Sequence, residues 1–151
     1  MDIWEIKNII GETTEYDKKL KLEVKKPKSW CKSISAFANT LGGFLIFGIS
    51  DDNQIVGLET PDKDAELISE IIKTRLKPIP EFKISFHTED GNVLLIVQVF
   101  KGEETPYYYS GDGLLEAYVR IGNESAKASP IELKRLVLRG RNTTFDSQNS
   151  M

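Results

Sequence analysis

The sequence of 151 residues has one cysteine and one histidine, and it lacks a long apolar run. Cys31 has no second cysteine for an intrachain disulfide, and His87 alone cannot complete a zinc site or a hydrolytic triad. Apolar runs such as that over residues 44–47 are far shorter than a membrane span, and the N-terminus lacks the apolar core of a signal peptide. We therefore expect a cytoplasmic protein without a disulfide, a zinc site or a membrane contact.

A phosphate-binding glycine loop is also missing. Such a loop lies between a strand and the N-terminus of a helix, and a Walker-type loop ends in Gly-Lys-Ser/Thr. Gly42 and Gly43 instead follow a predicted helix and enter a predicted strand, and no Gly-Lys-Ser/Thr occurs in the chain. We predict that Gly42 ends the helix in a left-handed conformation and that Gly43 allows close backbone approach.

The charges are unevenly distributed, although the net charge is only −3. Residues 18–32 carry seven lysines against one acid, and residues 49–70 carry seven acids against one lysine. Residues 117–141 are basic again. Two basic segments on one face could hold a polyanion, whereas separate ones would only keep the protein soluble. Both interpretations stay open at this level.

Hydrophobic periodicity divides the first half of the chain into a few elements. It predicts a short helix over residues 2–10, a half-buried strand over residues 20–25, and a helix capped by Ser29 whose apolar stripe runs from Trp30 to Leu41. The apolar run that starts at Phe44 is typical of a central strand covered on both faces. An Asp51-Asp52-Asn53 turn and a short strand over residues 55–58 follow.

The second half carries stronger local signals. Pro61 opens a helix that Pro78 ends, Asp90-Gly91 joins two strands into a hairpin, and a second strand pair, over residues 107–109 and 114–121, follows. Ser129-Pro130-Ile131-Glu132 is a capping box for a last helix that we expect to end at Gly140. The predicted fold is α+β, with a single mixed sheet and helices packed on it in one domain over residues 1–140, and a doubly wound nucleotide-binding fold is disfavoured.

Carboxylates are the residues that could support catalysis. Glu15, Glu23 and Asp51 could meet if the two predicted strands pair, and they would then bind Mg²⁺ or Mn²⁺ together with water and phosphate. Lys25 would stabilise the charge of a leaving group in such a metal-dependent nuclease. The alternative is that Glu23 pairs with lysines and that Asp51 belongs only to a turn.

Several stretches resemble the Schlafen AlbA-type domain family, the DNA-binding domains at the front of many bacterial proteins labelled transcriptional regulators. The resemblance rests on Leu22-Glu23-Val24-Lys25, on residues 34–52 with the block Ala-Phe-Ala-Asn-Thr-Leu-Gly-Gly, on Val56-Gly57-Leu58, and on residues 118–125 and 129–133. It covers roughly residues 15 to 140 and implies an α+β module associated with nucleic acid.

The animal Schlafen branch implies in addition a metal-dependent RNA-cleaving site. Glu23, Lys25 and Asp51 match the second glutamate, the lysine beside it and the aspartate of that site. Lys18 stands where the first glutamate would fall, and Glu15 or Asp17 could replace that glutamate only if the loop shifts. Because a lysine adds positive charge where a carboxylate is expected, we predict little or no nuclease activity.

The leading interpretation is a nucleic-acid-binding module, for DNA or RNA, of a bacterial transcriptional regulator. Its predicted contact residues are Lys18, Lys19, Lys21, Lys25, Lys26, Lys28, Lys32, Asn39, Thr40, Arg120, Lys134 and Arg135. We expect no cofactor, with Mg²⁺ or Mn²⁺ required only in the nuclease alternative. A protein-interaction or dimerisation module is the third class.

The residues after Gly140 bear on how much of the gene product this chain represents. Residues 141–151 are expected to be a polar tail or linker, and Thr144-Phe145-Asp146 resembles the stretch that leads into further domains in long relatives. A lone module of this kind usually needs a partner domain or a homodimer to reach specificity. We therefore expect the chain to be the N-terminal part of a longer protein.

Overall fold

The computed structural model describes residue 10 and residues 15–149. The predicted helix over residues 2–10 lies outside this part of the chain, except for Ile10. In chain order the elements are β1 Tyr16–Lys19, α2 Lys28–Asn39, β2 Gly43–Phe47, α3 Pro61–Arg75, β3 Leu76–Lys77, β4 Phe82–Glu89, β5 Asn92–Val99, β6 Tyr108–Gly111, β7 Leu114–Ile121, β8 Glu124–Lys127 and α4 Pro130–Asn149.

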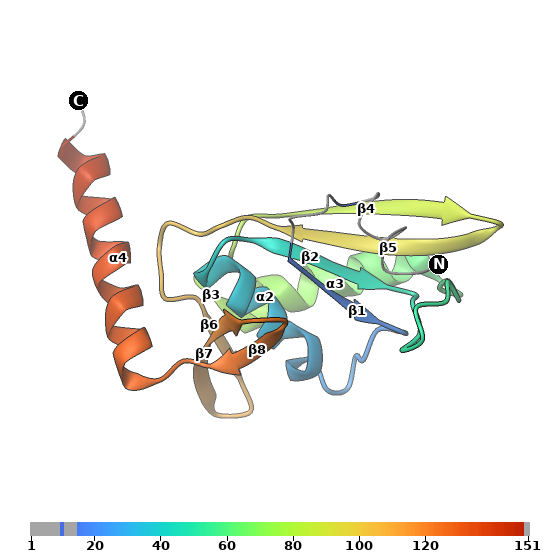
Figure 1. Ribbon diagram of the computed structural model, residues 1–151, viewed down its shortest axis with the longest axis horizontal. Helices are drawn as coiled ribbons and strands as arrows, with labels where there is room; N and C mark the ends of the chain where they lie inside the picture. Colours follow the sequence, from blue (N-terminus) through green and yellow to red (C-terminus); the bar gives the residue numbers. More distant parts are fainter. Residues whose placement is uncertain (1–9, 11–14, 150–151) are drawn as a thin grey trace.

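The strands form two sheets of four strands each (Figure 1). The first has the order β1-β2-β5-β4 and is mixed, because β1 runs parallel to β2 whereas β5 is antiparallel to both of its neighbours. The second has the order β3-β6-β7-β8 and is antiparallel throughout. The predicted α+β class is confirmed, but the single sheet is wrong, since β7 pairs with β6 and β8 rather than with the first sheet.

Helix α2 lies between the two sheets and forms the centre of the core (Figure 1). Trp30, Ile34 and Phe37 are fully buried, and the Trp30 ring meets Phe47 of the first sheet edge to face, with ring centres 5.9 Å apart. A helix covered from both sides needs small or apolar residues around most of its circumference, which explains why even Ser33 and Ser35 are buried.

The end of α2 agrees only partly with the sequence analysis. Gly42 has φ +78°, and its N–H donates to the Phe37 carbonyl oxygen at 2.8 Å, so the predicted glycine cap is confirmed. Leu41, predicted on the buried stripe, is 79% exposed because the helix ends at Asn39. At the other end the N-cap residue is Pro27, and the predicted cap residue, Ser29, is the second residue of the helix and makes no capping hydrogen bond.

The first strand lies earlier than predicted, at Tyr16–Lys19 rather than over residues 20–25. The N–H groups of Gly48 and Ile49 both donate to the Lys19 carbonyl oxygen, at 2.7 and 3.1 Å, and Gly48 has φ +109°. The partner strand turns away there, so β1 cannot continue. Residues 20–27 form a connecting loop in which Leu20 is half exposed, and Glu23 and Lys25 therefore do not share one face of a strand.

Several predictions that rest on local signals are confirmed. The β4–β5 hairpin turns at Asp90 and Gly91, both with positive φ, and α3 begins at Pro61. The capping box is complete, because the Ser129 N–H donates to Glu132 Oε1 at 2.9 Å and the Glu132 N–H donates to Ser129 Oγ at 3.2 Å.

Other local predictions are corrected in detail. The strand expected over residues 55–58 is reduced to a single bridge between Ile49 and Ile55, and β3 and β8 were not predicted. Helix α3 ends at Arg75, three residues before Pro78, because Leu76 and Lys77 already pair with β6.

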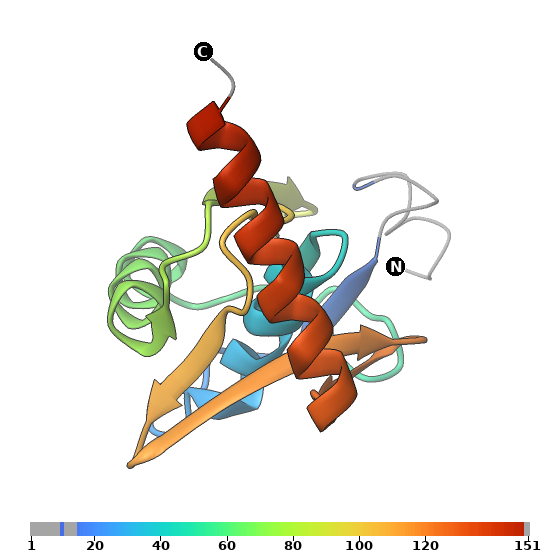
Figure 2. The same cartoon turned by 90° about the vertical axis from the view of Figure 1, so that its left-hand side faces the viewer.

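The last helix continues past Gly140 to Asn149 and crosses the face of the molecule shown in Figure 2. Gly140 does not end the helix. Close packing requires a glycine there, because a Cβ would lie 2.1 Å from the Thr105 carbonyl oxygen. The Thr105 hydroxyl in turn donates to the Leu136 carbonyl oxygen at 2.6 Å. Residues 141–149 are thus helical rather than an irregular tail, while the domain boundary at residue 140 stays a prediction.

Candidate functional site

Arg120 is an internal residue of the fold, although the sequence analysis placed it among the contact residues. Its side chain is 4% exposed and forms two hydrogen bonds with the Asp17 carboxylate, at 2.7 and 2.9 Å. The guanidinium also donates to Ser125 Oγ and lies 5.0 Å from the centre of the Phe37 ring. A guanidinium that is buried and paired with Asp17 cannot reach a ligand on the surface, so Arg120 is removed from the predicted contact set.

Asn39 is also structural. It is 1% exposed, and its side-chain amide donates to the carbonyl oxygens of Tyr107 and Tyr118, at 3.0 and 2.8 Å. Its oxygen accepts a hydrogen bond from the Tyr107 N–H at 2.7 Å. Asn39 therefore satisfies backbone groups of β7 and of the segment just before β6. It too is removed from the predicted contact set. The neighbouring Thr40 is half-buried, and its hydroxyl donates to the Ala36 carbonyl oxygen at 2.7 Å.

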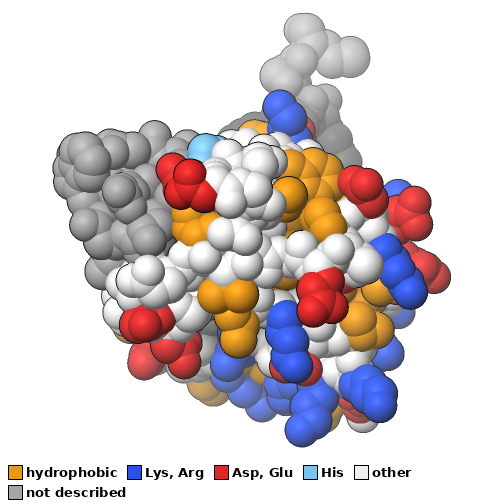
Figure 3. Space-filling model, turned by 90° about the vertical axis from the view of Figure 1, so that its right-hand side faces the viewer, with side chains coloured by type: hydrophobic (Ala, Val, Ile, Leu, Met, Phe, Trp, Pro, Cys, Tyr) orange, Lys and Arg blue, Asp and Glu red, His pale blue; other side chains and the backbone are white. Residues whose placement is uncertain are grey.

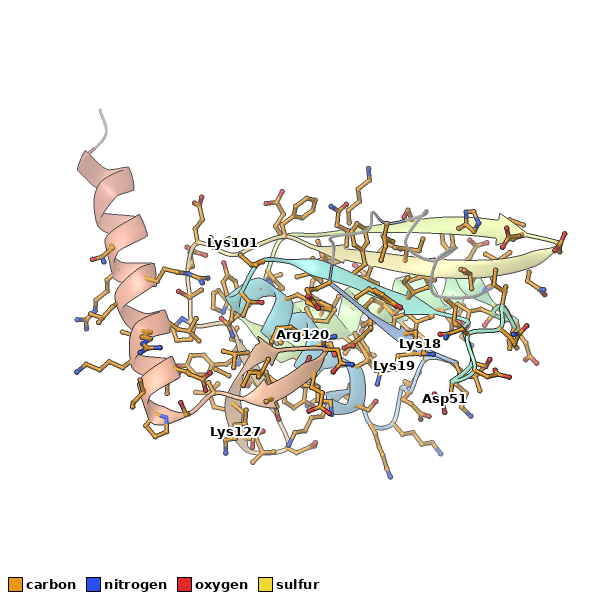
Figure 4. All side chains as sticks on the ribbon, in the orientation of Figure 1. Lys18, Lys19, Asp51, Lys101, Arg120 and Lys127 are labelled. Atoms are coloured by element: carbon orange, nitrogen blue, oxygen red, sulfur yellow. The ribbon has the colours of Figure 1, made fainter. Side chains whose placement is uncertain are left out.

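Lys18 and Asp51 come together at one end of the first sheet (Figure 4). The Lys18 ammonium donates to the Asp51 carbonyl oxygen at 2.7 Å and to the side-chain oxygen of Asn53. The Lys18 ammonium thus lies beside the Asp51 backbone, and in the sequence Lys18 stands where the resembling nucleases carry their first glutamate. This arrangement disfavours the nuclease alternative, because a fixed positive charge repels a divalent cation.

The predicted carboxylate set does not gather in the part of the chain that the structure describes. Glu15 lies 3.8 Å from Arg120 Nε, whereas Glu23 is exposed in the loop before α2 and accepts the Trp30 indole N–H through its backbone oxygen. Among the side chains that the structure describes, no group of three or more acidic, cysteine or histidine residues could hold a metal ion.

Most of the lysines of residues 18–32 are exposed or partly exposed along the loop between β1 and α2 and on the first turns of α2. Lys21, Lys25 and Lys26 are exposed in the loop between β1 and α2, and Lys28 and Lys32 follow on the first two turns of α2, partly exposed. Figure 3 shows Lys and Arg side chains gathered along the lower part of one face, at the level of this loop in Figure 1. We call these five residues, together with Lys19, the lysine surface.

A pocket of about 450 Å³ opens within the lysine surface. Lys25, Lys26, Lys28 and Lys32 line it from the side of α2, and Asp112, Tyr118 and Ser125 line it from the second sheet. The pocket exists because α2 begins beside the β6–β7 turn, a contact that the sequence analysis could not anticipate without the sheet order.

Glu116 of β7 lies beside the pocket and contacts three of the side chains around it. Its carboxylate lies 3.1 Å from Lys28 Nζ and 3.7 Å from Lys127 Nζ, and it accepts a hydrogen bond from the Tyr118 hydroxyl. The hydrogen bonds from Tyr118 and Lys28 lower the pKa of Glu116, and the same contact with Glu116 raises the pKa of Lys28. Glu116 and Lys127 were absent from the predicted set, since nothing in their local sequence indicates this pairing.

The predicted contact residues of the last helix lie apart from this pocket. Lys134 and Arg135 are exposed on α4, which packs through Arg139, whose guanidinium donates to the Asn39 and Gly102 carbonyl oxygens at 2.8 and 3.2 Å. Among the described residues, no helix is long and apolar enough to cross a membrane.

The arrangement defines a class of protein: a small α+β domain of two sheets around one buried helix, with a lysine-lined pocket where that helix begins. The chain belongs to the Schlafen, AlbA_2 family, whose model matches residues 11–129. The expected resemblance is thereby confirmed.

Two solved structures share the fold. The N-terminal domain of a Nitrosomonas europaea protein, described as related to the ATP-dependent DNA helicase RecG, is 26% identical with a TM-score of 0.58, and the match covers 83% of this chain and 90% of that one. A Corynebacterium diphtheriae protein is 19% identical with a TM-score of 0.58, and the match covers 83% of this chain but only 26% of that one. The second likeness concerns the fold alone.

Proposed function

We propose that this chain is a nucleic-acid-binding domain that holds the sugar-phosphate backbone through the lysine surface. The observation that carries the proposal is the concentration of six lysines in this surface, of which four line one pocket and only Lys28 has a carboxylate partner among the described residues. Lysines without partners are available to replace the counterions of a polyanion. The family and the neighbour described as related to a DNA helicase support the same class of ligand.

Contacts of this kind position a backbone and read little sequence, so we propose weak binding with little base preference by this domain alone. A role in a cytoplasmic transcriptional regulator, with further domains or a second copy supplying specificity, is the finer part of the proposal. DNA is the first ligand to test because of the helicase-related neighbour, and RNA is the comparison.

The test is fluorescence anisotropy with duplex DNA, single-stranded DNA and single-stranded RNA over a series of salt concentrations. Affinity for the duplex should fall with salt at a slope of about −0.9 per phosphate contact in a plot of log K against log salt. The triple variant Lys21→Glu, Lys25→Glu, Lys28→Glu should lose binding. A matched variant with the same charge change elsewhere, Lys63→Glu, Lys73→Glu, Lys83→Glu, should retain most of it.

Two results would count against the proposal. Unchanged affinity in the first triple variant, with folding verified by circular dichroism, would remove the lysine surface as the binding site. Equal loss in both variants would show that only the net charge matters. Failure of the unaltered domain to bind any of the three nucleic acids would favour the protein-interaction alternative.

A further inference from the structure

The pocket in the lysine surface is open to solvent and has the size of a small-molecule site. Its volume of about 450 Å³ falls within the range of pockets that hold small molecules. It has two walls, the start of α2 on one side and residues of the second sheet on the other. A group that enters it is therefore contacted from both sides.

The donors of the pocket are side chains rather than the free N–H groups of the helix start. The N–H groups of Ser29 and Trp30 already donate to the Lys26 and Pro27 carbonyl oxygens, at 3.1 and 3.2 Å. Lys25, Lys26 and Lys32 have no partner among the described residues, and Lys28 is held in place by Glu116 at 3.1 Å. Three ammonium groups without a partner among the described residues and one paired with Glu116 thus line the same space.

A serine hydroxyl of the pocket has no internal partner. Ser29 lines the pocket, and its Oγ is buried without a hydrogen-bond partner in the described part of the chain. Buried hydroxyls are nearly always satisfied, so an unsatisfied one calls for an explanation. Because a serine hydroxyl turns between staggered rotamers, it can meet a ligand oxygen without breaking an existing hydrogen bond.

The charge of the lining residues selects for a multiply charged anion. Four lysines face one acid, Asp112, which leaves three positive charges, and Glu116 behind the wall is itself shared by Lys28 and Lys127. An internal phosphodiester brings one negative charge. A phosphate monoester brings about 1.5 to 2 negative charges at pH 7 and three acceptor oxygens.

We propose that the pocket binds the terminal phosphate monoester of a nucleic-acid strand. The inference rests on the proposed function and adds to it a preference for strand ends that carry phosphate. The ammonium groups of Lys25, Lys26 and Lys32 close around the phosphate oxygens, Lys28 presents a fixed charge from the α2 side, and the volume leaves room for the attached nucleoside. The remaining lysines, Lys19 and Lys21, lie outside the pocket lining and contact the backbone that follows.

The experiment compares one single-stranded DNA sequence with a 5′-phosphate, with a 3′-phosphate and with hydroxyl groups at both ends, each labelled internally. At least one phosphorylated form should bind at least about tenfold more tightly than the form with two hydroxyl ends, because the phosphate adds charge-assisted hydrogen bonds. Comparison of the 5′-phosphate and 3′-phosphate forms shows which end is bound. The pocket variant Lys25→Gln, Lys32→Gln should lose this preference. The control variant Lys19→Gln, Lys21→Gln should bind every form more weakly and keep the preference.

Each other outcome overturns the inference. Equal affinity for phosphate and hydroxyl ends overturns it and leaves the proposed function in place. No binding of any of these forms overturns the inference, and it overturns the proposed function as well only if duplex DNA and RNA also fail to bind. A nucleoside monophosphate that binds as tightly as the phosphorylated strand shows that the pocket serves free nucleotides instead. Retention of the preference in the pocket variant, with native circular dichroism, places the phosphate elsewhere.

Discussion

The carboxylate of Asp17 and the guanidinium of Arg120 form a two-pronged ion pair between the two sheets, with Oδ1–Nη2 and Oδ2–Nη1 distances of 2.7 and 2.9 Å. The Ser33 hydroxyl of α2 donates to the same carboxylate, and Arg120 Nη2 donates to the Tyr16 carbonyl oxygen at 3.1 Å. One ion pair thereby joins β1, α2 and β7. The planar guanidinium suits this role because it donates several hydrogen bonds in fixed directions.

Removal of one partner of this pair should destabilise the fold. Arg120→Ala leaves the Asp17 carboxylate, 22% exposed, without its counter-charge, and we expect a loss of about 3 kcal/mol in the free energy of unfolding. Urea denaturation measures it. Arg120→Lys should recover only a part of the loss, because an ammonium cannot replace the paired geometry, and full stability in Arg120→Ala would contradict the assignment of Arg120 as structural.

Lys18 should prevent divalent-metal chemistry at the end of the first sheet. We expect no Mn²⁺-dependent RNA cleavage by the unaltered protein. Lys18→Glu replaces the ammonium by a carboxylate beside the Asp51 and Asn53 oxygens and should create Mn²⁺ binding, measured by calorimetry, with Lys18→Gln as the neutral control. RNA cleavage by the unaltered protein that disappears in Glu23→Ala or Asp51→Ala would show that the nuclease alternative is right.

Glu116 should make stability depend on pH in the acid range. Hydrogen bonds from Tyr118 and Lys28 lower its pKa in the folded state, so its contribution is complete above the pKa of the unfolded state, about 4.3, and is lost as the pH falls through the lower folded-state pKa. The difference in unfolding free energy between the unaltered protein and Glu116→Gln should therefore be larger at pH 6 than at pH 3. The exposed Glu124→Gln serves as the control, and a difference independent of pH would contradict the proposed cause.

Gly140 should be essential for the docking of α4. In an exposed helix, a change from glycine to alanine stabilises by up to about 1 kcal/mol, but here the new Cβ would lie 2.1 Å from the backbone oxygen of Thr105. We expect Gly140→Ala to destabilise the protein by roughly 1 to 3 kcal/mol in thermal or urea unfolding. Asn142→Ala, at an exposed position of the same helix, should be neutral or slightly stabilising.

The sequence predicted best those elements whose signals are local. Asp90-Gly91 specifies a hairpin turn by its backbone conformation, and the capping box from Ser129 specifies a helix start by its own hydrogen bonds. The strand expected over residues 20–25 failed because alternation of polar and apolar residues does not say whether a partner strand is present. The partner, β2, has already turned away at Gly48.

The site prediction was wrong for residues that belong to the family motifs but have structural roles. Asn39 and Arg120 carry polar groups that looked available, yet they satisfy buried groups from segments about 70 to 100 residues away in the chain. Such pairings depend on the order of the strands in the second sheet. The lysines of the lysine surface were predictable because charged residues in a loop stay on the surface without any tertiary information.

The contact between Lys18 and the turn at residues 51–53 has a further consequence. An ion bound from solution dissociates, and its occupancy varies with concentration and with chelators. The ammonium of Lys18 is covalently tethered to β1, so the turn that it holds keeps the same occupant under all of these conditions. We therefore expect the shape of this end of the first sheet to be the same with and without divalent ions.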